Sequence, residues 1–338
     1  MRPGNFLAPA AYCIDLTSGG HELRSRARAD WLITKAKGDD VKIHYVSDIH
    51  VEFGALDKPL PEGDILLLAG DTTVIALLAK HRQDAIARSV KKATKRLNDE
   101  IARKFRRAYA VIGNHEPYGS HIGEASKALA AALPSVTVLD CEHVNLSDDV
   151  ILFCAPLWTD MDRGNPLSSL AIRNGMTDFR LVKAGVDEPF TPEMAAAEFH
   201  NAIAYLGRLA EENRSKTVVV MTHHAPSRQG LSSRVPNALD RAYYSDLEYF
   251  IESHPNIRYW IFGHTHIRRT FEIAHCKVMS NARGYYRHEP MAQTFNPDVS
   301  FEVEHRQVPV AEGIEARAQL CRQIGAKMND ETSGRTDT

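Results

Sequence analysis

The chain has few cysteines, almost no net charge and no long apolar run, and each absence excludes a class of protein. Its five cysteines are far apart and none belongs to a C-x-x-C pair, which excludes a paired-thiolate zinc site and argues against a disulfide framework. The formal net charge is -2, so an anionic partner such as nucleic acid would need a local basic patch. No segment approaches the ~18 consecutive apolar residues of a membrane-spanning helix. We therefore predict a cytoplasmic protein without a membrane partner.

The first strong strand signal begins at Val41 and divides the chain into parts. Residues 1–40 lack sustained periodicity and end in a polar run, so we expect a poorly ordered appendage. One hypothesis is that translation starts at Val41 from a valine codon; mass spectrometry of the native protein that detects residues 1–40 would refute it. Residues 312–338 are polar and are expected to fray. Residues 41–311 remain, long enough to bury a large core.

Short β-branched runs alternate with helical patterns along residues 41–311, which predicts an α/β fold. Near the carboxyl end, three strands follow one another without helices, so the sheets should be mixed. Thr191 before Pro192 predicts a helix start, and 245–248 matches a capping box. The predicted strands are 41–46, 65–69, 108–112, 136–139, 150–154, 217–221, 258–262, 269–273, 277–279 and 300–303. The predicted helices are 84–105, 122–133, 191–213 and 245–253.

Polar side chains follow the ends of five predicted strands. Loops that leave the carboxyl ends of neighbouring strands converge on one crevice in open α/β sheets, so these side chains should share a site. They provide carboxylates, an amide and imidazoles, which are ligands for zinc, manganese and iron. The combination points to metal-assisted hydrolysis. The residues are Asp48 and His50; Asp71; Asn114, His115 and Glu116; His223 and His224; His264 and His266.

In order, these clusters read D-x-H, G-D, G-N-H-E, H and G-H-x-H, and the chain thereby resembles the calcineurin-like metallophosphoesterase superfamily over residues 41–305. The resemblance implies a four-layer αββα sandwich, with two mixed sheets flanked by helices and a dimetal site at the carboxyl ends of the strands. It implies that His115 stays unligated and faces the substrate. The implied ligands are Asp48, His50 and His266 for one metal, Asn114, His223 and His264 for the other, and Asp71 as a bridge.

The charges of such a site favour a phosphate ester. Two divalent cations carry four positive charges, Asp48 and Asp71 remove two, and a bridging hydroxide removes one, so one remains to attract the ester. We predict hydrolysis of a phosphomonoester or phosphodiester by the metal-bridging hydroxide. His115 would stabilise the transition state or protonate the leaving group. The two cations would be manganese, iron or zinc. The sequence does not indicate an oligomeric state.

Several residues near the clusters keep two interpretations each. The superfamily pattern favours His223 as the ligand, with His224 contacting a ligand or the substrate. Glu116 either orients a neighbour or caps its loop. Arg283 lies in an Asn-x-Arg-Gly-Tyr segment similar to strand ends in bacterial members, and it either contacts phosphate or forms a structural salt bridge. The segment 157–179 interrupts the strand order and is a candidate lid.

Two other functions are compatible with parts of the sequence. Residues 88–107 are rich in lysine and arginine, and such a basic helix could bind nucleic acid, which makes a nuclease the alternative. Apolar residues at helical spacing in the same segment instead indicate an amphipathic helix with a solvated face. A non-enzymatic scaffold of the same fold is disfavoured because none of the expected ligands is replaced.

Overall fold

The structure is a computed structural model that describes residues 41–232 and 237–303. The predicted appendage, residues 1–40, and the predicted tail, residues 312–338, lie outside the described residues. The expected domain, residues 41–311, is therefore described as far as Val303 apart from residues 233–236.

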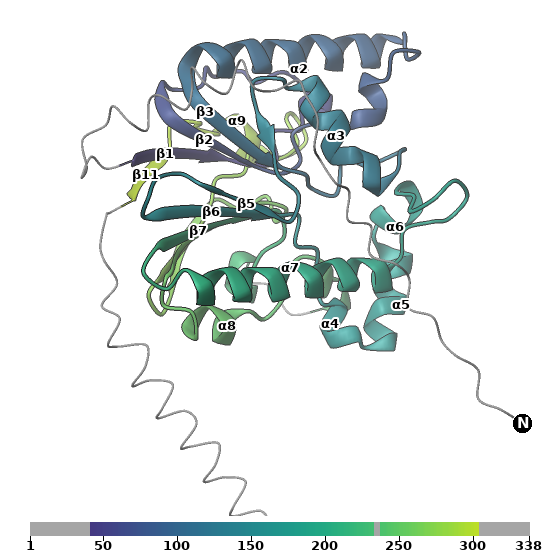
Figure 1. The fold of residues 1–338 in the computed structure, drawn as a ribbon. Coiled ribbons are helices and arrows are strands. Elements are labelled where there is room, and N and C mark those ends of the chain that lie inside the picture. The colour runs from purple at the N-terminus through teal and green to yellow at the C-terminus, as the bar shows by residue number, and fades with distance from the viewer. Residues whose placement is uncertain (1–40, 233–236, 304–338) are drawn as a thin grey trace, which may run out of the picture. The chain divides into compact units, whose positions relative to one another are not determined.

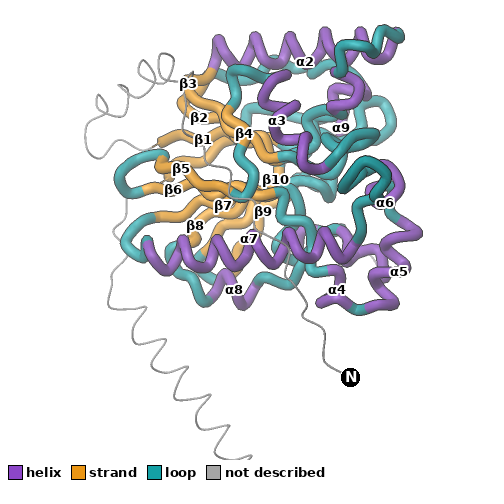
Figure 2. The backbone as a smooth tube through the Cα atoms, turned by 45° about the vertical axis from the view of Figure 1, so that its right-hand side comes forward, coloured by secondary structure: helices purple, strands orange, loops and turns teal. Residues whose placement is uncertain are grey.

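Two mixed β-sheets form the centre of this domain, and Figures 1 and 2 show them stacked on each other. In the first sheet, β11 is antiparallel to β1 and the other neighbours are parallel. Its order is β11 (Ser300–Val303), β1 (Val41–Val46), β2 (Gly63–Ala69), β3 (Phe105–Val111) and β4 (Thr137–Val138). In the second sheet, the edge strands β5 and β9 are antiparallel to their neighbours. Its order is β5 (Glu142–Asn145), β6 (Val150–Ala155), β7 (Thr217–Thr222), β8 (Ile257–Ile261), β10 (Cys276–Ser280) and β9 (Arg269–Ile273).

Helices cover the outer face of each sheet. The first sheet packs against α2 (Ala85–Lys104) and α3 (Ile122–Ala132), and the second against α7 (Pro192–Glu212) and α8 (Glu248–Glu252). A third apolar cluster fills the space between the sheets. Side chains of a strand alternate between its faces, so Leu66 and Leu68 of β2 contact the helix layer while Ile65 and Leu67 contact the other sheet. The predicted four-layer sandwich of mixed sheets is confirmed.

Of the two predicted helix starts, one is confirmed and one is wrong. The Thr191 hydroxyl accepts a hydrogen bond from the Met194 amide at 3.3 Å, with Pro192 in the first turn. At the second, α8 begins only at Glu248, and the Ser245 hydroxyl accepts from the amide of Asp160 at 2.9 Å. A buried backbone N–H needs a hydrogen-bonding partner. The Ser245 hydroxyl is bonded to the distant Asp160 amide and therefore does not cap the helix that the local sequence predicted.

The segment between β6 and α7 is helical, which the sequence did not predict. It contains α5 (Pro166–Gly175), α6 (Asp178–Leu181) and α4 (Met161–Gly164), the last a single turn with positive φ at all four residues. A further short helix, α9 (Pro290–Gln293), follows β10. Trp158, Ile172 and Phe179 form a separate apolar cluster within this segment. The predicted lid region is thus a packed subdomain beside the ends of the strands (Figure 1). No helix in the described ranges is long and apolar enough to cross a bilayer.

Candidate metal centre

Each predicted polar cluster lies where a strand ends, and several of its residues have a left-handed backbone. This conformation costs a non-glycine residue on the order of 1–3 kcal/mol and persists where the surroundings impose it, commonly at functional sites. The residues with φ between 47° and 65° are Asp48, His50, Asp71, His264 and His266. Most of the predicted ligands therefore sit on strained turns that aim their side chains into one region.

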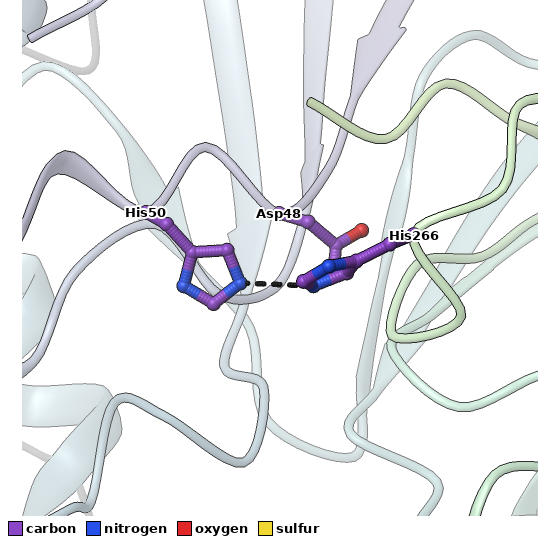
Figure 3. A group of neighbouring side chains, drawn as sticks. All are labelled: Asp48, His50 and His266. Carbon is purple, nitrogen blue, oxygen red and sulfur yellow. Dashed lines mark hydrogen bonds and ion pairs between the residues drawn. The ribbon is translucent and has the colours of Figure 1, made fainter. Parts of the chain in front are cut away.

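Asp48, His50 and His266 form the first donor group, shown in Figure 3. Their ligand atoms lie within 4.8 Å of one another. The Nε2 atoms of the two histidines are 3.1 Å apart, and His266 Nε2 is 3.5 Å from Asp48 Oδ1. Each Nδ1 contacts a carboxylate, of Glu52 at 2.8 Å for His50 and of Glu289 at 2.9 Å for His266. These carboxylates fix the tautomers, so both Nε2 atoms are free to bind a cation.

Asp71, His223 and His264 form the second donor group, and all three residues are buried. His223 Nδ1 donates to the Ala69 carbonyl at 2.9 Å, and its Nε2 lies 3.0 Å from Asn114 Oδ1 and 3.4 Å from Asp71 Oδ2. Asp71 Oδ2 is also 3.4 Å from His50 Nε2 of the first group. The Asp71 carboxylate therefore lies between the two groups, where a bridging ligand would be.

A buried atom without a partner indicates what this second group lacks. His264 Nε2 is buried and makes no hydrogen bond, although buried polar atoms in proteins nearly always have a partner. A divalent cation would satisfy it together with the converging oxygen and nitrogen donors. The two donor groups thus fit a pair of divalent cations.

The charges of the metal-free site support the same interpretation. Burial alone would lower the pKa of His223, but the Asp71 carboxylate outweighs it and raises that pKa to about 10. Burial together with the neighbouring His224 and His223 holds the pKa of His264 well below its usual range. A proton on His223 therefore balances the buried carboxylate, and a bound cation would displace it.

His115 lies beside the donor groups with its ring held on three sides. Its Nδ1 is 3.4 Å from Glu52 Oε1, its Nε2 is 3.1 Å from the Tyr285 hydroxyl, and its ring stacks on Tyr118 at 4.3 Å. His50, Glu52 and His115 also form a third group with converging donors. We interpret it as an orienting carboxylate between two imidazoles, because Glu52 contacts the Nδ1 atom of each ring.

The structure favours one interpretation for each ambiguous residue. His224 Nδ1 donates to the Pro156 carbonyl at 3.1 Å, and its buried ring packs on His264, so His223 is the member of the pair within the donor group. Burial lowers the pKa of His224 to about 3, so its ring is neutral. His224 thus contacts the candidate ligand His264. The sequence predicted a contact with either a ligand or the substrate.

Glu116 caps the loops around the site rather than facing it. Its buried carboxylate accepts hydrogen bonds from the backbone amides of Asp71, Thr72, Thr73 and Gly113 at 2.6–3.3 Å. This arrangement ties the loop after β2 to the loop after β3. These contacts favour the capping alternative over the orienting one.

The contacts of Arg283 favour the structural salt bridge over the phosphate contact. Its side chain is fully buried, lies 3.8 Å from the Asp57 carboxylate and donates to the carbonyls of Ile49, Gly54 and Ala55, each at 2.8 Å. A guanidinium whose N–H groups hold three backbone carbonyls is not available to a substrate.

Three carboxylates around the site were not singled out from the sequence. Glu52 lies two residues after His50, so a D-x-H-x-E pattern could have indicated it. Glu289 and Asp178 are far in sequence from every motif residue they contact, and only the folded chain shows their positions.

Comparison with known proteins agrees with this geometry. The family model described as calcineurin-like phosphoesterase matches residues 41–268. The chain belongs to this family. It is accordingly a hydrolase that acts on phosphoric ester bonds.

The chain is similar to several known proteins at low sequence identity. The chain is 25% identical over 284 residues to uncharacterized protein L509 of Acanthamoeba polyphaga mimivirus, covering 78% of this chain and 96% of that protein. Among solved structures, it resembles phosphopantetheinyl hydrolase (PptH) from Mycobacterium tuberculosis, with a TM-score of 0.53, 19% identity and coverage of 82% and 98% of the two chains. A dimetal phosphatase from Danio rerio matches with a TM-score of 0.44 and 11% identity, over 75% of this chain and 90% of that one.

Proposed function

We propose that this chain is a dimetal phosphoesterase that hydrolyses a phosphomonoester or phosphodiester, with His115 acting on the leaving group. The observation that carries the proposal is the Asp71 carboxylate, placed within 3.4 Å of an imidazole from each donor group. The bound cations would be manganese, iron or zinc, held by Asp48, His50 and His266 and by Asn114, His223 and His264, with Asp71 between them. When bound, such a pair lowers the pKa of a water and polarises the phosphoryl group.

His115 is suited to act on the oxygen that leaves phosphorus. Its backbone amide donates to Asp71 Oδ1 at 2.8 Å, which fixes the residue beside the donor groups. The Glu52 carboxylate orients Nδ1, and Nε2 points toward the Tyr285 hydroxyl. Burial lowers the pKa of His115, but Asp71 and Glu52 outweigh it and raise that pKa to about 9 in the metal-free site. A protonated imidazole would hydrogen-bond the leaving oxygen as negative charge develops on it.

Purified protein with manganese should hydrolyse p-nitrophenyl phosphate or bis-p-nitrophenyl phosphate, and a chelator should abolish the activity. His115→Ala should keep both metals by elemental analysis and lose ~100-fold or more in kcat, in the range expected for general acid–base catalysis. His81→Ala, at an exposed histidine in the turn before α2, is the matched control and should keep full activity. Turnover that survives stoichiometric removal of metal would refute the proposal.

The substrate is best sought with a panel of esters. Similarity of fold to phosphopantetheinyl hydrolase is a reason to include a phosphopantetheinyl diester. Single-stranded DNA tests the nuclease alternative. Support for that alternative is weak, since Val90, Leu97 and Ile101 of α2 pack on the first sheet and Lys95 and Lys104 pair with acidic residues of the same helix. A cytoplasmic location stays a prediction, and the free cysteines at 141, 154 and 276 fit it.

A further inference from the structure

The side chain of Asn114 has two ends of similar shape and opposite chemistry. Its Oδ1 atom can bind a cation, whereas its Nδ2 group carries two hydrogens and cannot. In the structure, Oδ1 lies 3.0 Å from His223 Nε2, on the side of the second donor group. Because the two ends fill nearly the same volume, close packing alone does not choose between them. A hydrogen-bonding partner is needed to fix the orientation.

Asp178 is that partner. Its Oδ1 atom accepts a hydrogen bond from Asn114 Nδ2 at 2.7 Å and another from the Tyr118 hydroxyl at 2.6 Å. The Tyr118 hydroxyl also accepts from Asn114 Nδ2, at 3.1 Å, but a hydroxyl can donate or accept and does not by itself choose an end of the amide. Only 3% of its surface is exposed, so water does not compete for these bonds. A carboxylate accepts hydrogen bonds and cannot donate them. Reversing the amide would place two oxygens against each other and leave both amide hydrogens facing the donor group.

Asp178 belongs to a segment that contains none of the family's motifs but is fixed firmly against one of them. The segment docks on the loop after Asn114 through three backbone hydrogen bonds. Gly119 N donates to Leu181 O at 2.9 Å, and residues 120, 122 and 183 add two more at 2.9–3.0 Å. The adjacent Phe179 is buried in the segment's apolar cluster. The position of the Asp178 carboxylate is therefore set by the fold of the whole segment.

The two donor groups are supported by different parts of the chain. In the first, Glu52 and Glu289 hold the Nδ1 atoms of His50 and His266. In the second, His223 is held by the Ala69 carbonyl, and Asp178 contacts Asn114 alone among the candidate ligands. A change at Asp178 should therefore act on one cation only.

We propose that Asp178 is a positioning residue that presents the oxygen end of Asn114 to the cation held by Asp71, His223 and His264. Binding of that one cation thereby depends on the segment between β6 and α7. The inference rests on the proposed function through the assignment of Asn114 as a ligand.

The test is equilibrium binding of Mn²⁺ to the full chain, measured by dialysis with elemental analysis and by calorimetry. Wild type should bind two ions. Asp178→Ala should weaken the affinity for one ion ~10–100-fold, the usual effect of losing a residue that orients a ligand. The affinity for the other ion should stay unchanged. Asn114→Ala should weaken the affinity for the same ion, and the double variant should lose no more affinity than Asn114→Ala alone. Glu289→Gln should instead weaken the affinity for the other ion, and its effect should add to that of Asp178→Ala in the double variant. The control Asp187→Ala removes an exposed carboxylate of the same segment and should change neither ion.

Further variants separate orientation from loss of structure. Asp178→Leu keeps the branched shape of the side chain without an acceptor and should show the same selective loss if the alanine variant does not fold. Asp178→Asn retains an acceptor oxygen for Asn114 and should keep most of the affinity. The inference is overturned if Asp178→Ala weakens the affinity for both ions or for neither. It is also overturned if the losses of affinity in Asp178→Ala and Asn114→Ala add in the double variant. Wild type that binds two ions without hydrolysing any ester would refute the proposed function and leave this inference standing.

Discussion

Arg283→Met is expected to destabilise the fold rather than to remove a contact with the substrate. The guanidinium is fully buried and donates to the carbonyls of Ile49, Gly54 and Ala55 at 2.8 Å each. These carbonyls belong to the turn that follows Asp48, so the side chain fixes the loop that presents the first donor group. Methionine fills a comparable volume without a single donor. The variant therefore removes the hydrogen bonds and little of the packing.

The size of the effect follows from the three carbonyls. A buried polar group that loses its partner costs ~1–3 kcal/mol, which gives ~3–9 kcal/mol for three. Gly54 and Ala55 are only half-buried, so their carbonyls can regain water, whereas that of Ile49 cannot. The lower part of the range applies, and we expect a loss of ~3–5 kcal/mol in the free energy of unfolding. For a domain of this size, this corresponds to a fall of roughly 10 °C in Tm.

Urea denaturation of the metal-free protein, followed by tryptophan fluorescence, measures this loss. Arg283→Lys keeps the charge but lacks the planar fork that reaches three carbonyls, so it should lie between methionine and wild type. Arg287→Met is the matched control, since Arg287 is exposed and lies 5.5 Å from the Tyr286 ring, and it should change stability by less than ~0.5 kcal/mol. An unchanged denaturation midpoint combined with a raised KM would refute this reasoning and restore the phosphate-contact interpretation.

Two further predictions concern the metal centre. Because the pKa of His223 is raised to about 10 in the metal-free fold from ~6.5 in the unfolded chain, its protonation stabilises the fold fully below pH ~6.5, and this contribution is lost as the pH rises toward ~10. The denaturation midpoint of metal-free protein should therefore fall over that range, with a shallower fall in His223→Ala, while manganese affinity rises over the same range; a pH-independent manganese affinity would contradict this. Gly113→Ala would place a methyl group against Asp71 Oδ1 and 2.7 Å from His223 Cε1, so it should abolish binding of at least one ion in the same dialysis assay. The control Gly123→Ala, where no atom lies within 4 Å, should bind two ions, and two ions bound by Gly113→Ala would show that the crowding is relieved.

The sequence by itself determined the described strands except the edge strand β5, which it missed, together with the long helices and the polar residues at the strand ends. These signals are local: alternation and β-branched runs specify strands, apolar residues at helical spacing specify α2 and α7, and Thr191 with Pro192 specifies a helix start. Five short motifs in a fixed order also specified the family, because each motif residue lies on a turn directly after its strand. Ser245 shows the limit of local reasoning, because its hydroxyl accepts a hydrogen bond from the amide of Asp160, far away in the sequence, and does not cap a helix.

Only the tertiary structure decided what each ambiguous side chain does. Glu116 and Arg283 were recognisable as charged residues near the motifs, but their roles depend on backbone groups that approach from other loops. Asp178 lies in the candidate lid segment 157–179, but neither it nor Glu289 was recognisable as a residue that orients a ligand, because such a carboxylate needs only to reach the ligand in space. Sequence patterns record the neighbours of a residue along the chain. Hydrogen bonds to a ligand's far end, and the burial that strengthens them, arise only when distant segments pack together.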